Sequence, residues 1–459
     1  MKTLLAVLLP LAATSPLLAQ APYLARPTSS YSIDDIGTMS PDPAHAVKPT
    51  GINNRGHVHG SNELKGYMGT PKVHSYFWDG VVQHHIYPLA PTLALPGDLN
   101  DKDQVVGYST AGSVALHGYL WEGGGLTDIH VGLLDFSHAT DISRDGWVVG
   151  TNSMMVDGEW LSQFRAYLRE PGGQWVDLGT LGGVKAFGAN LNERLDTVGT
   201  TSDVSGATRG FFKPFGAPMQ DLGSLTGGWV VPLEVNDTGL VVGFDCDPGT
   251  GANRPVTWQG GVLTGLGTLG GANGKAGGVN SFGDVVGWSE DMSGTQRACL
   301  WREGGTPVDL GALIPSGTGW ELTGAAEIND LGEICGTGVL WGNTRTYRLT
   351  PRGRVPRVSG VQPAMADRDA AVFGLGFQPG ATIILVYGYA PGPSALPGCA
   401  SATVDIASPI VIGTTVADSD GRIEYGLTLP SAVAGQTLRI AAVDMAGCSS
   451  SEVIVQTFN

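Results

Sequence analysis

The histidines are the residues of this chain whose type and spacing could do chemistry, because all nine fall between His45 and His138. His57 and His59 lie two residues apart on one expected strand, so both side chains face the same way. His74 falls on a segment that can pair with that strand, which would bring three imidazoles together around a zinc or copper ion. No carboxylate follows at the spacing of a catalytic metal site, and the pattern therefore favours neither a metal nor a cofactor.

His74 also belongs to a position that recurs seven times, where a basic residue is followed by one spacer and a short apolar strand. Arg occupies this position in five of the seven copies, so a structural hydrogen bond is favoured over metal ligation. Seven equivalent cations could instead bind seven anionic groups around a ring. The seven positions are His74, His117, Arg165, Arg209, Arg254, Arg297 and Arg345.

An enzyme is the alternative that the histidines leave open. A polysaccharide lyase or hydrolase could use His, Tyr and Arg of the first three repeats, with His as the general base and Arg neutralising a uronate carboxylate. The chain contains no Gly-x-Ser-x-Gly elbow, no His-Glu-x-x-His pair and no phosphate-binding loop. We therefore assign no catalytic residue.

A repeated hairpin indicates which elements hold these residues. Each copy has a turn of the Asn-Asp-x-Gly type and a glycine seven residues after the residue that opens the turn. Such a turn is expected to be type I followed by a left-handed residue, and Leu195 at that place predicts a different turn in its repeat. The copies are residues 52–60, 99–107, 142–150, 191–199, 235–243, 279–287 and 328–336.

The repeats are 43 to 49 residues apart, a period that fits four-stranded propeller blades better than helical repeats or a β-solenoid. A strand built on Asp-Leu-Gly also recurs in step with the repeats, in a degenerate form near residues 87–90. The chain opens with such a strand, 32–39, and its last repeat, 322–350, has none. An all-β, seven-bladed β-propeller over residues 31–351 is therefore predicted, closed by the N-terminal strand. The Asp residues expected to pair with the basic positions are Asp35, Asp128, Asp177, Asp221 and Asp309.

Over residues 31–351 three motifs resemble the HAF repeats of extracellular bacterial proteins. They are the basic-x-aromatic strand, the Asn-Asp-x-Gly-x-Val-Val-Gly hairpin and the "DLGTLGG" segment at 177–183. His74 and His117 match the histidine of that family, and Arg replaces it in the other copies. The resemblance implies secretion, but it names no substrate and adds no catalytic residue.

A second domain is expected after the repeats. A Pro- and Arg-rich linker, 352–360, leads to residues 361–459, whose short strands and turns predict an Ig-like β-sandwich. This segment resembles the C-terminal module that follows diverse exported proteins in planctomycete-like bacteria.

The N-terminus has the composition of a secretory signal peptide, which we assign to residues 1–19. Export permits disulfides, and Cys399 with Cys448, the two cysteines of the C-terminal segment, are expected to pair. Cys299 and Cys335 replace apolar residues of other repeats and are expected to be buried thiols. The redox state is left unassigned for Cys246, Cys299 and Cys335.

The net charge of −16 would repel a phosphate backbone, so no nucleic acid partner is expected. No segment after the signal peptide could cross a membrane, and we expect a monomer that is secreted, extracellular, cell-surface or periplasmic. The favoured function is a non-catalytic binding or structural protein whose propeller face meets an extracellular carbohydrate or protein. The secreted lyase or hydrolase is the alternative.

Overall fold

The structure is a computed structural model that describes residues 30–37, 47–65, 71–90, 92–111, 115–130, 136–156, 159–302, 305–353, 356–362, 368–396 and 399–458. The predicted signal peptide, 1–19, lies outside these residues. Within them the regular structure is β-strand apart from two short 3-10 helices, η2 (Leu310–Leu313) and η3 (Ser431–Val433). Glycine-rich turns and β-branched strands account for this all-β structure.

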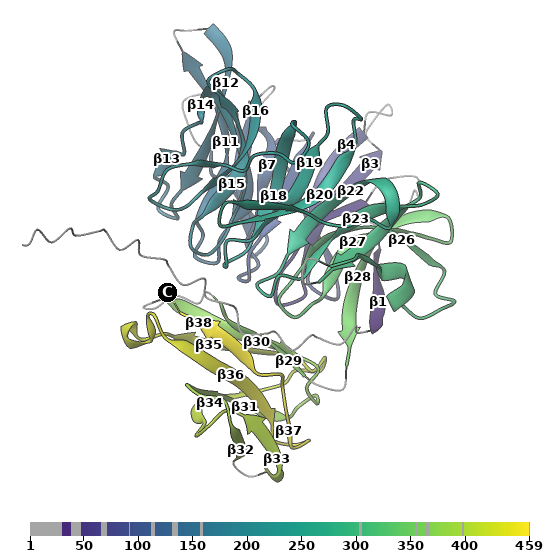
Figure 1. Ribbon diagram of the computed structural model, residues 1–459, viewed down its shortest axis with the longest axis vertical. Coiled ribbons are helices and arrows are strands. Elements are labelled where there is room, and N and C mark those ends of the chain that lie inside the picture. Colours follow the sequence, from purple (N-terminus) through teal and green to yellow (C-terminus); the bar gives the residue numbers. More distant parts are fainter. Residues whose placement is uncertain are drawn as a thin grey trace, which may run out of the picture.

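Seven antiparallel four-stranded sheets form the ring of a β-propeller, as predicted (Figure 1). Blade 1 consists of β2 (Val47–Ile52), β3 (Val58–Lys65), β4 (Pro71–Trp78) and β5 (Gln83–Ile86). Blade 2 consists of β6 (Ala94–Leu99), β7 (Val105–Ala111), β8 (Ala115–Glu122) and β9 (Gly125–Asp128). Blade 3 consists of β10 (Ser137–Ile142), β11 (Val148–Val156), β12 (Glu159–Arg169) and β13 (Trp175–Asp177). Blade 4 consists of β14 (Gly182–Leu191), β15 (Thr197–Asp203), β16 (Thr208–Lys213) and β17 (Gln220–Asp221).

The remaining three blades have the same order of strands. Blade 5 consists of β18 (Trp229–Val235), β19 (Val241–Cys246), β20 (Asn253–Gln259) and β21 (Val262–Gly265). Blade 6 consists of β22 (Gly270–Val279), β23 (Val285–Asp291), β24 (Gln296–Trp301) and β25 (Val308–Asp309). Blade 7 is β26 (Trp320–Ile328), β27 (Ile334–Leu340), β28 (Asn343–Arg352) and β1 (Ser30–Gly37).

The N-terminal strand completes the last blade, which confirms the predicted closure. β1 pairs antiparallel with β28, with Ser32 opposite Thr350 and Asp35 opposite Tyr347. Tyr31 and Tyr347 are fully buried in the apolar core of this blade. Burial of two large aromatic side chains stabilises the junction between the ends of the repeat region.

The seven Asn-type turns share one backbone conformation. Its left-handed residue is glycine in five blades, for example Gly239 at φ +77°, and is Asp103 at φ +61° in blade 2. Leu195 adopts the same conformation at φ +64°, so the prediction of a different turn in blade 4 was wrong. Leu195 is 3% exposed and packs with Leu191 and other residues of its blade core. Burial of its side chain offsets the cost of a left-handed leucine.

An asparagine opens the turn in six of the seven blades, and this residue also joins neighbouring blades. Its side-chain oxygen accepts hydrogen bonds from the turn, as Asn236 does from Thr238 and Leu240 at 3.0 Å each. Its side-chain nitrogen donates to the next turn, as Asn236 does to the carbonyl oxygen of Asn280 at 2.8 Å. The donor–acceptor pairs are Asn53–Asn100, Asn100–Ser143, Asn192–Asn236, Asn236–Asn280, Asn280–Asn329 and Asn329–Asn53, at 2.8–3.2 Å.

Two sheets of the C-terminal strands share a core, which confirms the predicted sandwich, and a third sheet has only two strands. β29 (Arg357–Gln362) begins within the segment expected to be a linker, 352–360. Val372 of one sheet and Ile383 of the other are fully buried in the same apolar cluster. The other strands are β30 (Asp369–Leu375), β31 (Thr382–Gly388), β32 (Pro393–Leu396), β33 (Cys399–Asp405), β34 (Ile410–Val416), β35 (Ile423–Thr428), β36 (Thr437–Asp444), β37 (Ser449–Ser450) and β38 (Ile454–Thr457).

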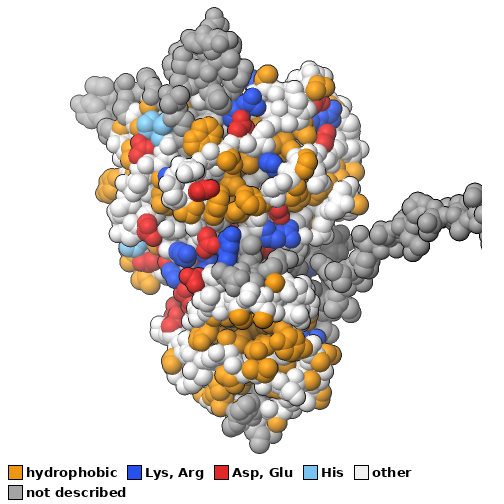
Figure 2. Space-filling view, turned by 90° about the vertical axis from the view of Figure 1, so that its left-hand side faces the viewer, with side chains coloured by type: hydrophobic (Ala, Val, Ile, Leu, Met, Phe, Trp, Pro, Cys, Tyr) orange, Lys and Arg blue, Asp and Glu red, His pale blue; other side chains and the backbone are white. Residues whose placement is uncertain are grey.

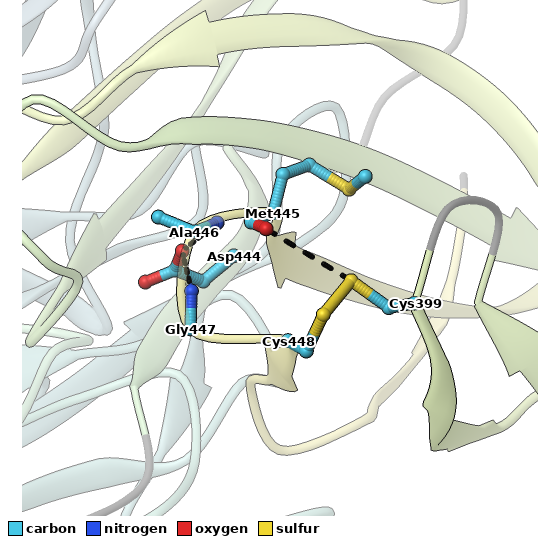
Figure 3. The surroundings of a disulfide bond; sticks show 6 residues. All are labelled: Cys399, Asp444, Met445, Ala446, Gly447 and Cys448. Atoms are coloured by element: carbon cyan, nitrogen blue, oxygen red, sulfur yellow. Dashed lines mark hydrogen bonds between the residues drawn. A yellow bond between two sulfur atoms is a disulfide. The ribbon is translucent and has the colours of Figure 1, made fainter.

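The predicted disulfide between Cys399 and Cys448 is present (Figure 3). It joins the start of β33 to a turn in which the Asp444 carboxylate accepts hydrogen bonds from the backbone N–H groups of Ala446 and Gly447, at 2.8 and 3.0 Å. The bond closes a loop with a sequence separation of 49 residues. A loop of that length corresponds to a stabilisation of about 4 kcal/mol in the chain-entropy model.

The other cysteines are free thiols in the propeller. Cys299 and Cys335 are fully buried, as predicted, and burial raises the pKa of both. Cys246 is only half-buried. Both buried thiols lie in apolar surroundings and have a raised pKa, so they stay protonated and unreactive.

The sandwich packs against the end of the propeller that carries the Asn-type turns, here called the turn face. Arg422 forms a buried ion pair with Glu333, and Arg55 forms a double hydrogen bond with Glu424 at 3.0 Å. Phe373 packs with Leu331, a turn residue of blade 7. A band of charged side chains lies where the two parts meet (Figure 2). Arg422 and Glu333 make this contact specific, since either charge alone would be buried without a partner.

Ser143 is the one position in the turn series that has no amide to donate to the next blade. Replacement by Asn would add a donor for the carbonyl oxygen of Asn192 while its side-chain oxygen replaces the Ser143 hydroxyl, which accepts from Trp147 at 3.1 Å. We expect Ser143→Asn to stabilise the protein by about 1 kcal/mol. Thermal and urea unfolding would measure the change. The reverse substitution, Asn236→Ser, should destabilise by a similar amount, and a Ser143→Asn protein that melts earlier would contradict the role of the amides.

Candidate functional site

A central cavity of about 170 Å³ lies inside the ring near the turn face and has lining residues from all seven blades. The position two residues before the turn-opening residue faces this cavity in most blades. It is acidic in four of them, and the series is Gly51, Asp98, Asp141, Asn190, Glu234, Gly278 and Glu327. The repeat alignment contains this signal, although the turn residues by themselves do not predict it.

Several of these side chains join one blade to the next. Asp141 accepts a hydrogen bond from the backbone N–H of Leu191 at 2.8 Å. Glu234 accepts one from the backbone N–H of Val279, also at 2.8 Å. The side-chain oxygen of Asn190 likewise accepts a hydrogen bond from a backbone N–H group of the following blade. These carboxyls therefore hold the inner strands together, in addition to lining the cavity.

Two glycines in the same series make room for the acids of their neighbours. A Cβ atom at Gly51 would collide with the carboxylate of Asp98. A Cβ atom at Gly278 would lie 3.1 Å from a carboxylate oxygen of Glu234. Small residues in blades 1 and 6 thus accommodate large acidic side chains from blades 2 and 5.

A second group of acidic side chains follows directly after the turn-opening residues. Asp101 accepts from the backbone of Asn54 at 2.8 Å, and Asp330 accepts from the backbone of Ser281 at 2.8 Å. Gln362 of β29 donates to Asp330 at 2.6 Å, so the sandwich covers this end of the cavity. The other members of the group are Glu193 and Asp237. Among the described residues that line the cavity, Arg144 is the one basic side chain.

Burial keeps protons on several of these acids. Burial raises the pKa of Asp141 to about 6, of Asp330 to about 7, and of Glu234 to about 8. Burial and the charge of Glu234 raise the pKa of Glu327 well above its ordinary value. Neighbouring carboxyls in a site with little water cannot all ionise, so they share protons. The cavity is a network of interblade hydrogen bonds with reduced charge near neutral pH.

The structure does not bring His57, His59 and His74 together. The Nδ1 atom of His57 lies 2.8 Å from Asp103, at the turn face. His59 is fully buried, and its Nε2 atom contacts Thr50 and Gly97. His74 lies opposite Asn62 rather than beside His59, and its Nδ1 atom is 2.6 Å from Nε2 of His85. Among the described residues, no three His, Cys, Asp or Glu side chains form a group that could hold a metal ion.

The seven basic positions lie at the opposite end of the ring from the turn face, where the third strands of the blades begin, here called the far face. Arg297 pairs with Asp291 at 3.3 Å instead of with the expected Asp309. His74 meets His85, which stands where other repeats have Asp. Four pairs match the expectation: His117–Asp128 at 2.7 Å, Arg165–Asp177 at 3.8 Å, Arg209–Asp221 at 3.9 Å and Arg345–Asp35 at 3.9 Å.

Rings from blades 1 to 3 stack on one another at the far face. Tyr108 and His138 are parallel, with ring centroids 3.6 Å apart. His117 stacks on His130 at 4.1 Å, and His85 contacts Tyr87 at 4.1 Å. Burial lowers the pKa of His138 to about 4, so this imidazole is neutral at ordinary pH. His74, His85, His117, His130 and His138 take part in these ring contacts, which spacing along the chain did not show.

No protein-family model matches the chain, and no curated protein matches it in sequence. The chain is similar in structure to a fungal alcohol oxidase of the AA5 family in complex with copper, at 12% identity, with 94% of this chain and 100% of that chain covered and a TM-score of 0.43. It is also similar to TolB from Acinetobacter baumannii, at 13% identity, with 62% and 60% covered and a TM-score of 0.36. A gluconolactonase from Xanthomonas campestris matches at 13% identity, with 70% and 90% covered and a TM-score of 0.35.

These similarities carry no argument about activity, because all three TM-scores are below 0.5. The propeller is established by the strand pairing of the chain itself. The HAF resemblance finds no matching family model and stays a prediction. Within the described part of the chain, no helix is long and apolar enough to span a membrane.

The cavity acids predict how stability depends on pH. Burial gives such an acid a higher pKa in the folded state than in the unfolded state, where it is near 4. Its contribution to stability is complete below the unfolded pKa and is lost as the pH rises through the folded pKa. With folded values of about 6 to 8, stability should decrease between pH 5 and pH 8. Glu327→Gln keeps a neutral side chain and should raise stability at pH 8 by about 1 kcal/mol, with less effect at pH 5.

Thermal unfolding from pH 5 to pH 8 would measure both effects. Glu321, an exposed residue of the same strand, provides the matched control, and Glu321→Gln should leave the pH profile unchanged. A melting temperature that rises steadily from pH 5 to pH 8 would contradict the proton-sharing network.

Proposed function

We propose that this protein is an exported binding protein that engages an extracellular carbohydrate through the far face of its propeller. The arrangement of the two faces supports this proposal. The sandwich covers the turn face through Arg422, Glu424 and Gln362. In the central cavity, Asp141 and Glu234 are engaged in interblade hydrogen bonds. Surface for a ligand is thus concentrated at the far face.

The observation that carries the proposal is the set of stacked and exposed rings on that face. Tyr87 is 70% exposed beside His85, and Trp341 is 75% exposed on the turn between β27 and β28. Flat aromatic surfaces pack against the C–H face of a sugar ring, while imidazole and phenol groups exchange hydrogen bonds with its hydroxyls. A large exposed ring costs solvation free energy that a ligand would recover.

Export is part of the same proposal. The signal-peptide composition of residues 1–19 and the HAF resemblance support it, and the disulfide between Cys399 and Cys448 is consistent with an oxidising compartment. We propose a monomer of one propeller, residues 31–351, and one sandwich, residues 361–459, that serves for attachment.

A secreted polysaccharide lyase or hydrolase is the second candidate. One contact favours it: the neutral imidazole of His138 lies against Tyr108, with ring centroids 3.6 Å apart. A neutral imidazole can accept a proton, as the general base of a lyase does. Release of unsaturated or reducing products from a polysaccharide by the wild-type protein would establish this function in place of pure binding.

Glycan-array binding followed by calorimetry on the best ligand would test the proposal. We expect Tyr87→Ala and Trp341→Ala to weaken binding on the order of tenfold each, equivalent to about 1.4 kcal/mol for one lost ring contact. Phe215 is an exposed aromatic residue at the turn face, where it contacts Trp147. Phe215→Ala is therefore the matched control and should bind normally. An equal loss in all three variants, or no glycan bound by the wild type, would refute the proposal.

A further inference from the structure

Blade 5 breaks the repeated pairing of a basic residue with an acidic one at the far face. In blade 4 the Nε atom of Arg209 lies 2.9 Å from Asp203 and 3.9 Å from Asp221. Asp221 lies opposite Phe211, the second residue after the arginine. In blade 5 the residue opposite Val256, at the equivalent place, is Gly265. The fourth strand of this blade therefore supplies no carboxylate.

Arg254 consequently differs from its counterparts. Its Nη2 atom lies 3.2 Å from Asp247, which corresponds to Asp203 of blade 4. No second carboxylate among the described residues lies within ion-pair distance of Arg254. Its side chain is 55% exposed, compared with 34% for Arg209. One side of the guanidinium group is left for another anion.

The place of the missing carboxylate is part of a cavity of about 690 Å³ between blades 5 and 6. A Cβ atom at Gly265 would meet a single atom, Cδ1 of Leu225 at 3.5 Å, which is an ordinary contact. Arg254, Leu225 and the backbone of Gly267 line the cavity. The side chains of Thr250 and Thr268 add two hydroxyl groups.

We propose that this cavity binds the carboxylate of a uronic acid unit in an extracellular polysaccharide, with Arg254 as the residue that pairs with it. The ligand carboxylate would take the place that Asp221 has in blade 4. This inference rests on the proposed function and specifies the chemical class of the ligand.

The surroundings favour a uronate over other anions. Asp247 shares the guanidinium group, so a single negative charge completes the pairing while a doubly charged phosphate would be repelled. Leu225 is 53% exposed and offers an apolar surface to a sugar ring. Glycine backbone allows close approach. The Thr268 hydroxyl donates to the carbonyl oxygen of Gly271 at 2.9 Å and accepts from Gly270, and its remaining lone pair can accept from a sugar hydroxyl. Each of these groups suits a ring that carries one carboxylate.

Gly265→Asp tests the proposal directly, because it places the missing carboxylate beside Arg254. Gly265→Asn is the matched control, since it has the same shape without the charge, and the backbone of Gly265 is not in the left-handed region. Arg254→Gln removes the cation, and Arg209→Gln removes one whose carboxylate partners are both supplied by the chain. Circular dichroism and thermal unfolding would show that each variant is folded.

The probes are a galacturonic acid hexamer and its methyl ester, compared by calorimetry at fixed ionic strength. We expect the wild type and Arg209→Gln to prefer the free acid by about tenfold, the effect of one charge-assisted pair. Gly265→Asp and Arg254→Gln should lose this preference and bind the ester as the wild type does. Gly265→Asn should retain most of it.

The outcomes separate this inference from the proposed function. Equal binding of acid and ester by the wild type, or equal behaviour of Gly265→Asp and Gly265→Asn, would refute the carboxylate site while glycan binding stands. Binding of polyglutamate with the same dependence on Gly265 and Arg254 would refute the uronate in favour of an acidic peptide. Failure of the wild type to bind any glycan on the array would refute the proposed function itself.

Discussion

The hydrogen bonds between the turn-opening asparagines are the constraint on which the rest of the structure depends. A buried amide must find partners for both its oxygen and its nitrogen. Asn236 satisfies the oxygen within its own turn and the nitrogen at Asn280 of the next blade. Asn329 returns to Asn53, so the series connects the last blade to the first. In six of the seven blades the same residue type therefore shapes the hairpin and joins it to a neighbouring blade.

This spacing brings the inner strands close enough for their acidic side chains to meet. Asp141 and Glu234 each bond to the backbone of the following blade, and Glu327 lies in the same cavity. Burial then raises the pKa of these acids and keeps part of their charge neutralised. The cavity acids therefore help to connect neighbouring blades. The sandwich lies on the turn face and does not cover the far face of the ring.

At the far face, the blades whose residues differ from the repeated pattern indicate more about possible ligand contacts than the blades that follow it. His85 replaces an Asp, stacks on His74 and contacts Tyr87, and the three blades that carry the histidines present paired rings. Gly265 replaces an Asp and leaves Arg254 with one carboxylate and an adjoining cavity. Where a residue and its partner recur from blade to blade, their contact maintains the fold. A blade that lacks the usual partner can offer the same interaction to a ligand.

The sequence by itself determined the all-β class, the number of blades, the closure by the N-terminal strand and the pairing of Cys399 with Cys448, because each depends on a repeated or paired pattern along the chain. Tertiary structure alone decided which side chains meet across blades. The Asp98 carboxylate fills the space at Gly51, and His74 meets His85 instead of His59. Leu195 keeps the common turn because its side chain is buried. Such contacts depend on distances around a closed ring, and local spacing along one strand does not contain them.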